Sequence, residues 1–274
     1  MKCIEIRIMV NTALFNKFPV ALITGGLSGI GFESALMLLE RSIHVAAVSS
    51  KADEHIEAKS RLKDVGDRNG VKAIFFSLDL RDSDRVFNVV SEVVKILGPI
   101  TILVNAAGVY HHETILNHSI DSWANTMAIN LTGPFLTTRA CWPDMIAAGH
   151  GRVINIASTA AHIGMAEYAS YCASKSGLLG LTRVTALEGA CHGINCNSIS
   201  PSWVDTPMMR KSLNQQAKTL GLSIDELYAN AKDANPQGRI ITPQEIAQYV
   251  TWLALDAPSA LTGEDILMTG GAQW

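Results

Sequence analysis

A tyrosine and a lysine lie four residues apart, at Tyr171 and Lys175, in a stretch with helical patterning. That spacing places both side chains on one face of a helix. A free phenol has a pKa of about 10, and a lysine ammonium one turn away would stabilise the phenolate and lower that pKa. Ser158, which closes an apolar run, could hydrogen-bond a carbonyl oxygen as negative charge develops on it. These residue types predict proton transfer to or from a substrate oxygen.

A glycine-rich loop follows the first apolar run and precedes a helical stretch. It reads Thr24-Gly25-Gly26-Leu27-Ser28-Gly29-Ile30-Gly31. Glycines permit a tight turn and let backbone N–H groups approach a pyrophosphate, and the dipole of the following helix favours negative charge there. The placement between a strand and a helix predicts a dinucleotide site.

Apolar runs alternate with amphipathic stretches from Val20 to the end of the chain. The predicted strands are 18–24, 44–50, 72–80, 100–108, 152–158, 195–200 and 265–268. The predicted helices are 29–42, 52–67, 81–97, 122–148, 168–192 and one that starts near Pro243. Val- and Ile-rich strands without alternation indicate a parallel sheet covered on both faces. We therefore expect an α/β fold: a single-domain, doubly wound parallel sheet of about seven strands, the Rossmann fold.

Residues 1–18 read as an N-terminal extension, and 19–274 as one catalytic domain. The stretch 202–238 begins after Pro201, contains Pro207 and Pro236, and reads as irregular. Insertions of that length in compact domains often serve as lids or binding loops. We expect a substrate lid there.

Composition excludes several classes of partner. The net charge of -3 on 274 residues gives no electrostatic footprint for nucleic acid, and no run of 18 apolar residues suggests a membrane span. The five cysteines are odd in number and include no C-x-x-C pair, which favours a reducing, cytoplasmic setting. A small-molecule substrate is the expected partner.

Together these motifs resemble the short-chain dehydrogenase/reductase family over nearly the whole chain. The glycine loop matches the family's T-G-x-x-x-G-x-G, and Asn105-Ala106-Ala107-Gly108 resembles its N-N-A-G with Ala106 in place of an asparagine. The resemblance implies an NAD(P)-dependent oxidoreductase that interconverts a secondary alcohol and a ketone by hydride transfer. It implies Tyr171 as general acid–base, Ser158 on the carbonyl oxygen, Lys175 on the nicotinamide ribose and Asn130 placing a proton-relaying water. No metal is required.

The resemblance also implies a set of cofactor contacts, in which Asp79 meets the adenine and Thr206 the nicotinamide amide. The family's Pro-Gly reads Pro201-Ser202 here. The residues expected to bind the cofactor are Gly25, Leu27, Ser28, Gly29, Ile30, Gly31, Ser49, Ser50, Lys51, Asp79, Leu80, Asn105, Ala106, Gly108, Tyr171, Lys175, Pro201, Val204 and Thr206.

The end of the second strand bears on the choice of cofactor. An acid there would bind the ribose 2′-hydroxyl of NAD and repel a 2′-phosphate. The strand ends instead in Ser49-Ser50-Lys51, whose hydroxyls and ammonium could accept a phosphate. NADP(H) is favoured, with NAD(H) as the alternative.

The expected lid resembles those of 3-hydroxybutyrate dehydrogenases and aromatic polyketide ketoreductases. Where the former carry Gln, His and Lys to hold an acid, this chain has Tyr110, Ala160 and Tyr168. We therefore expect a neutral, largely apolar cyclic or aromatic substrate. The alternatives are a 3-hydroxybutyrate-type hydroxy acid dehydrogenase and, more distantly, a non-catalytic nucleotide sensor. The expected substrate contacts are Tyr110, His111, His162, Tyr168, Trp203 and Met208. The resemblance further implies a homotetramer built on helices 122–148 and 168–192.

Overall fold

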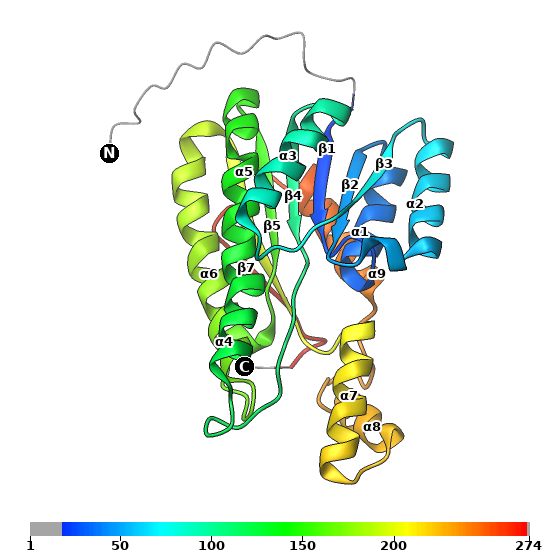
Figure 1. The fold of residues 1–274 in the computed structure, drawn as a ribbon, viewed down its shortest axis with the longest axis vertical. Coiled ribbons are helices and arrows are strands. Elements are labelled where there is room, and N and C mark those ends of the chain that lie inside the picture. The colour runs from blue at the N-terminus through cyan, green and yellow to red at the C-terminus, as the bar shows by residue number, and fades with distance from the viewer. Residues whose placement is uncertain (1–17, 273–274) are drawn as a thin grey trace.

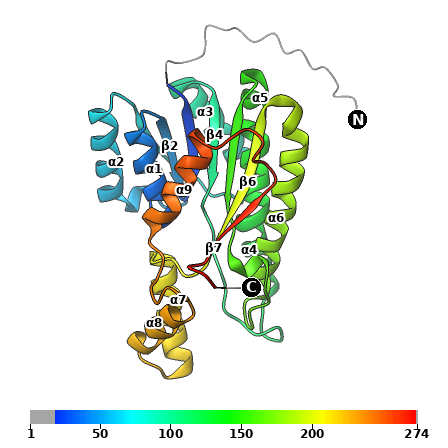
Figure 2. The ribbon, with the colours of Figure 1, turned by 180° about the vertical axis from the view of Figure 1, so that it is seen from behind.

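A computed structural model describes residues 18–272. The expected N-terminal extension, apart from Phe18, lies outside the described residues, and so do residues 273–274. The sheet is a single layer of parallel strands with helices on both faces (Figures 1 and 2). The strands are β1 (Val20–Thr24), β2 (His44–Ser49), β3 (Ala73–Ser77), β4 (Ile100–Asn105), β5 (Gly151–Ile156), β6 (Ile194–Pro201) and β7 (Asp265–Met268). Their order, β3-β2-β1-β4-β5-β6-β7, confirms the expected doubly wound fold.

The chain builds the sheet outward in two directions from a point between β1 and β4: β2 and β3 lie on one side, and β5 to β7 lie on the other. In open α/β sheets, ligands bind at such a switch point, outside the carboxyl ends of the strands. Thr24 pairs with Asn105 at that end of β1 and β4. The glycine loop and the Asn105-to-Gly108 segment therefore leave the sheet side by side.

The helices fall on the two faces of the sheet. Helix α1 packs against α9 and α2 on one face, while α3 packs against α5 on the other, where α6 packs against β6. Their bounds are α1 (Gly29–Glu40), α2 (Ile56–Arg68), α3 (Ser83–Leu97), α4 (Ile120–Met127), α5 (Gly133–Ala148), α6 (Ala169–Gly189), α7 (Pro207–Leu220), α8 (Ile224–Asp233) and α9 (Pro243–Leu255). Short helical turns are η2 (Ala52–Glu54), η3 (Ala128–Thr132), η4 (Thr159–Ala161) and η5 (Ala190–His192). No helix of residues 18–272 has the length and apolar character needed to cross a membrane.

Strand β1 divides its side chains between two cores because successive residues of a strand face opposite sides. Ala21 and Ile23 pack with α1 and α9, whereas Val20 and Leu22 pack with α3 and α5. All five β1 residues are buried. Burial on both faces explains why the strand reads as an unbroken apolar run.

Two segments differ from the sequence expectation. The long helix expected over 122–148 is interrupted by the π-helical turn η3, which separates α4 from α5. The stretch 202–238, expected to be irregular, forms α7 and α8. Both helices begin at good caps: Thr206 precedes Pro207 at the start of α7, and Ser223 and Glu226 form a capping box on α8. The helix pair projects below the sheet in Figure 1.

Candidate active site

One cavity of about 580 Å³ runs along the carboxyl ends of the strands from the glycine loop to α7. It brings together most of the residues that the sequence singled out. These are Gly25, Ser28, Gly29, Ile30, Ser49, Ser50, Asp79, Leu80, Ala106, Gly108, Tyr110, Ser158, Tyr168, Tyr171, Lys175, Pro201, Trp203, Val204, Thr206 and Met208.

Tyr171, Lys175 and Ser158 meet on the wall of this cavity. Tyr171 and Lys175 lie one turn apart near the start of α6, and the Lys175 ammonium is 5.8 Å from the centroid of the Tyr171 ring. Ser158 follows β5, its hydroxyl lies beside the Tyr171 phenol, and its Oγ accepts a hydrogen bond from the Ala160 N–H at 3.1 Å. A carbonyl oxygen placed between Ser158 and Tyr171 would face two hydroxyl groups able to donate to it.

Burial dominates the ionisation of this pair. Burial raises the pKa of Tyr171, and only the neighbouring Ser158 hydroxyl opposes that rise. Burial also lowers the pKa of Lys175 to about 8. The expectation that Lys175 lowers the Tyr171 pKa is not met in this arrangement, because burial of the phenol raises that pKa and Lys175, itself buried, is not among the groups that lower it.

Asn130 is fully buried in η3 and does not lie on the cavity wall. Its amide N–H groups donate to the Val109 carbonyl at 2.8 Å and to Ser174 Oγ at 3.1 Å, and its Oδ1 accepts from the Val109 N–H at 2.8 Å. Both amide protons are thus used within the protein. Asn130 holds the chain after Gly108 in place, and a water relay through it stays a prediction.

The glycine loop forms a cradle that side chains would fill. A Cβ on Gly25 would lie 2.9 Å from the Ala107 nitrogen, one on Gly29 would lie 3.1 Å from Thr206 Cγ2, and one on Gly31 would clash with the Gly25 carbonyl oxygen. Gly25 and Gly29 also have positive φ, which favours glycine. At the N-terminus of α1, Ser28 makes no side-chain cap and the first turn carries no acid. The backbone N–H groups at the start of α1 are therefore suited to bind a pyrophosphate.

The end of β2 offers hydroxyl groups to the cavity. Ser49 and Ser50 line it, but Lys51 points away and pairs with Glu54 at 3.0 Å, with both side chains exposed. Asp79, after β3, also lines the cavity and is paired with Arg81 at 2.5 Å. That hydrogen-bonded pairing lowers the pKa of Asp79.

Three further residues expected to touch the cofactor do not line the cavity, and they pack or bond within the framework. Leu27 belongs to the apolar core, and Gly31 packs against Gly25. Asn105 is buried in a polar chain: Thr137 Oγ1 donates to its Oδ1 at 2.8 Å, and its Nδ2 donates to Asn155 Oδ1 at 2.9 Å. The chain ties α5 to β4 and β5. None of the three lines the cavity.

Aromatic side chains cluster at the lid end of the cavity. The Tyr168 ring lies between those of Tyr110 and Tyr171 in a series of contacts, with centroid distances of 6.0 Å and 6.5 Å. Trp203 and Met208 complete this part of the wall from the lid side. Tyr168, the residue directly before α6, is also bound by the lid, because Gln216 Nε2 donates to its hydroxyl at 3.1 Å.

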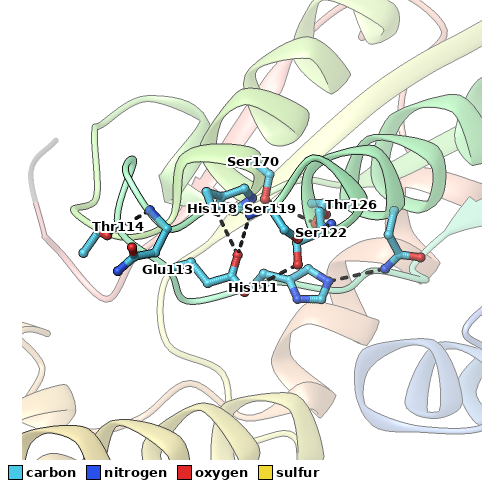
Figure 3. A network of polar contacts seen from close by, with 10 residues as sticks. His111, Glu113, Thr114, His118, Ser119, Ser122, Thr126 and Ser170 are labelled. Atoms are coloured by element: carbon cyan, nitrogen blue, oxygen red, sulfur yellow. Dashed lines mark hydrogen bonds and ion pairs between the residues drawn. The ribbon is translucent and has the colours of Figure 1, made fainter.

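His111 and His162, both expected to touch substrate, do not line the cavity. His111 turns toward α4, where its Nε2 is 3.4 Å from Asn125 Nδ2 (Figure 3). Its neighbour Tyr110 occupies the cavity wall instead. His162 pairs instead with Asp265 of β7 at 2.6 Å.

The segment after Tyr110 is fastened to the start of α4, and α4 to α6, by the polar contacts of Figure 3. Glu113 accepts from the Ser119 N–H at 3.3 Å, and Ser170 of α6 donates to Thr126 of α4 at 3.2 Å. This network holds the Tyr110 side of the cavity against the helix that carries Tyr171.

The sequence reading missed several wall residues. Ser212 lies on α7, and Ile163 and Met165 follow Ser158. Ser212 lies one turn after Met208 on the same helical face, so helical spacing would have pointed to it if the segment had been recognised as a helix. For Ile163 and Met165 the sequence carries no such signal. Among residues 18–272, no three His, Cys, Asp or Glu side chains gather as a metal site would require.

Comparison with known proteins decides the family. The family model for the short chain dehydrogenase matches residues 19–217. The chain belongs to the short-chain dehydrogenase family. Since the similar members are dehydrogenases, this chain is an oxidoreductase that acts on CH–OH groups.

Individual relatives match this chain over nearly its full length. It is 35% identical to D-threitol dehydrogenase of Mycolicibacterium smegmatis over 252 residues, which is 92% of each chain. It is 32% identical to D-beta-hydroxybutyrate dehydrogenase of Cupriavidus necator over 252 residues, 92% of this chain and 96% of that one. A solved structure of an actinorhodin polyketide ketoreductase variant with NADPH matches with a TM-score of 0.86 at 31% identity, covering 93% of this chain and 97% of that chain.

Proposed function

We propose that this dehydrogenase interconverts a secondary alcohol and a ketone on a neutral, largely apolar cyclic or aromatic substrate. The observation that carries the proposal is the make-up of the cavity beside Ser158 and Tyr171. Tyr110, Tyr168, Trp203 and Met208 line it there, and none of them is a cation that could hold a carboxylate. Aromatic and thioether side chains favour flat apolar ligands.

The bound nicotinamide cofactor would supply or accept the hydride. Ser158 and Tyr171 would both donate to the carbonyl oxygen, and Tyr171 would pass its proton to that oxygen in reduction and take it back in oxidation. Because the pKa of Tyr171 is raised, the phenol is protonated near neutrality, which suits the donor role in reduction. Lys175 would hold the nicotinamide ribose, and Asn130 is proposed to place the water that returns the proton.

We infer that NADP(H) is the preferred cofactor, with NAD(H) as the alternative. Ser49 and Ser50 line the cavity after β2, where an acid would disfavour a 2′-phosphate. The similar polyketide ketoreductase holds NADPH. Lys51 is turned toward Glu54, so its part in phosphate binding requires a change of side-chain rotamer.

The second candidate is a 3-hydroxybutyrate-type hydroxy acid dehydrogenase. The relative from Cupriavidus necator carries that name and matches over nearly its full length. Against it stand Tyr110 and Tyr168, which lie on the cavity wall and cannot form an ion pair with an acid. A catalytically inactive nucleotide sensor is a more distant candidate, and it would not need Ser158, Tyr171 and Lys175 in one place.

We further propose a homotetramer in the cytoplasm. The long helices expected at the interface carry exposed apolar side chains: Phe135 on α5, and Val184 and Leu187 on α6. Faces of that kind are typical of contacts between copies of a chain. Gel filtration with light scattering would test the assembly.

The decisive assay follows the absorbance of NADPH and NADH with neutral cyclic and aromatic ketones and with acetoacetate. Consumption of NADPH with the neutral ketones is expected. Consumption of NADH with acetoacetate alone would support the hydroxy acid candidate instead. Tyr171→Phe should abolish turnover while cofactor binding, followed by NADPH fluorescence, persists. A variant that kept its turnover would contradict the oxidoreductase mechanism.

A further inference from the structure

The cavity carries charge at only two of its described positions. Among residues 18–272 that line it, the charged side chains are Asp79 and Lys175. Asp79 follows β3, four strands away from β5, and is paired with Arg81. Lys175 donates to the Ile156 carbonyl at 2.7 Å. The lid end therefore presents aromatic rings, methionines and uncharged hydroxyl groups to the substrate.

Among the described residues, two hydroxyl groups of the cavity wall make no hydrogen bond with the protein. Of the buried side-chain polar atoms in residues 18–272 that make no hydrogen bond, two belong to the cavity wall: the Tyr110 hydroxyl and Ser202 Oγ. Ser202 directly follows Pro201 and β6. Tyr110 lies in the aromatic cluster, near Ser212 of the lid but outside hydrogen-bond geometry with it.

The neighbouring hydroxyl groups are already satisfied. Tyr168 and Ser212 lie 3.3 Å apart, and Gln216 Nε2 donates to both at 3.1 Å. Tyr110 is thus the free donor beside a filled network. A buried phenol without a partner is costly, so a ligand oxygen at this point would be strongly recognised.

Its position relative to the reacting groups defines what the ligand must look like. The Tyr110 ring contacts Tyr168, and Tyr168 in turn contacts Tyr171, so an aromatic ring separates the two phenols. We propose that Tyr110 donates a hydrogen bond to a second, uncharged oxygen of the substrate, held apart from the reacting carbon by an apolar ring. The substrate class is then a neutral hydroxy-ketone or diol on a ring. This inference rests on the proposed function and narrows it.

The test compares wild type with Tyr110→Phe, which removes only the hydroxyl. The control is Tyr249→Phe, which makes the same change on α9 against Trp252, outside the cavity. The substrates are cyclohexanone, 4-hydroxycyclohexanone and 4-oxocyclohexanecarboxylate, together with 1-tetralone and 6-hydroxy-1-tetralone. The quantity measured is kcat/KM for each ketone with the preferred reduced cofactor.

We expect wild type and Tyr249→Phe to prefer the hydroxylated member of a pair by about tenfold. Tyr110→Phe should abolish that preference because it lowers kcat/KM for the hydroxylated ketone by about tenfold more than for its unsubstituted partner. The carboxylate should be the poorest of the cyclohexanones throughout. A preference that survives in Tyr110→Phe, an equal loss on both members, or a best rate with the carboxylate would overturn the inference.

A second measurement, the melting temperature of the ligand-free protein, needs no substrate. If the phenol has no protein partner, Tyr110→Phe should keep or raise the melting temperature of the ligand-free protein. A fall of several degrees would mean that the hydroxyl is held by the protein, and would overturn the inference. If wild type reduces none of the ketones although it binds cofactor, the proposed function fails, and this inference fails with it.

Discussion

The Lys175 ammonium donates a hydrogen bond to the Ile156 carbonyl oxygen at 2.7 Å. Ile156 is the last residue of β5, and Ser158 lies two residues beyond it. The contact therefore joins the first turns of α6 to the strand end that carries the serine. It fixes Tyr171, one turn before Lys175, against Ser158, so the lysine also serves to align the other two groups.

The buried lysine predicts a pH dependence of stability. Burial lowers its pKa to about 8 from the ordinary lysine value of 10.5. Between these values the unfolded chain binds a proton that the folded chain does not, so the free energy of unfolding rises with pH across this range. From about pH 7 to about pH 9, wild type should gain about 1 kcal/mol relative to Lys175→Met.

Urea unfolding at the two pH values measures that difference. Lys211→Met, which changes an exposed lysine of α7, should keep the wild-type dependence. A Lys175→Met protein with the same pH dependence as wild type would show that this lysine does not titrate in the range.

Gly31 predicts a steric limit on the cofactor loop. Since a Cβ there would clash with the Gly25 carbonyl oxygen, Gly31→Ala should cost about 1–3 kcal/mol of stability and weaken NADPH binding. Gly180→Ala is the control, because a Cβ on that α6 glycine meets no atom within 4 Å and alanine favours the helix by up to about 1 kcal/mol. Chemical unfolding and cofactor titration measure both. Equal behaviour of the two variants would contradict the cradle geometry.

Ser50 predicts a change of cofactor preference. An acid at the end of β2 would repel a 2′-phosphate, so Ser50→Asp should lower the ratio of kcat/KM for NADPH over NADH by at least about tenfold, or ~1.4 kcal/mol. Ser60→Asp, on the exposed surface of α2, adds the same charge away from the cavity and should leave the ratio alone. An unchanged ratio in Ser50→Asp would mean that Ser50 does not face the ribose.

His111 and His162 are predicted to be dispensable for substrate recognition. Neither lies on the cavity wall, so His111→Ala and His162→Ala should each keep kcat/KM within about threefold of wild type. His162→Ala should still lose up to about 1 kcal/mol of stability with its Asp265 contact. Met208→Ala, a change on the wall, serves as the positive comparison. A large rise of KM in either histidine variant would return that residue to the substrate site.

Local patterns carried most of the sequence prediction. The strands could be recognised because β1 and its neighbours are buried on both faces, and the Tyr171–Lys175 spacing needs only one helix to bring the two side chains together. Ser158 could be placed because the carboxyl ends of parallel strands share one edge. These inferences depend on the chain near each residue.

What failed depends on contacts between distant parts of the chain. Whether His162 faces the substrate is decided by Asp265, about a hundred residues away, and whether Asn105 faces the cofactor is decided by Asn155. The pKa of Tyr171 follows from burial, which no spacing reveals. In the lid, a proline such as Pro207 suggests a break in structure from sequence alone, although here it occupies the first turn of a helix.

The helix pair α7–α8 has an apolar core of its own, formed by Met209, Leu213, Leu227, Ala231 and Ile240. The two chain segments that connect it to the sheet are joined to each other where Val204 bridges Ile241. We expect that a unit with its own core and adjoining ends can be exchanged as one block, provided that the contact of Gln216 with Tyr168 is kept. Transplanting 205–240 between relatives of this family should therefore carry selectivity with it, while the sheet, the cofactor cradle and the Ser158–Tyr171 pair stay as they are.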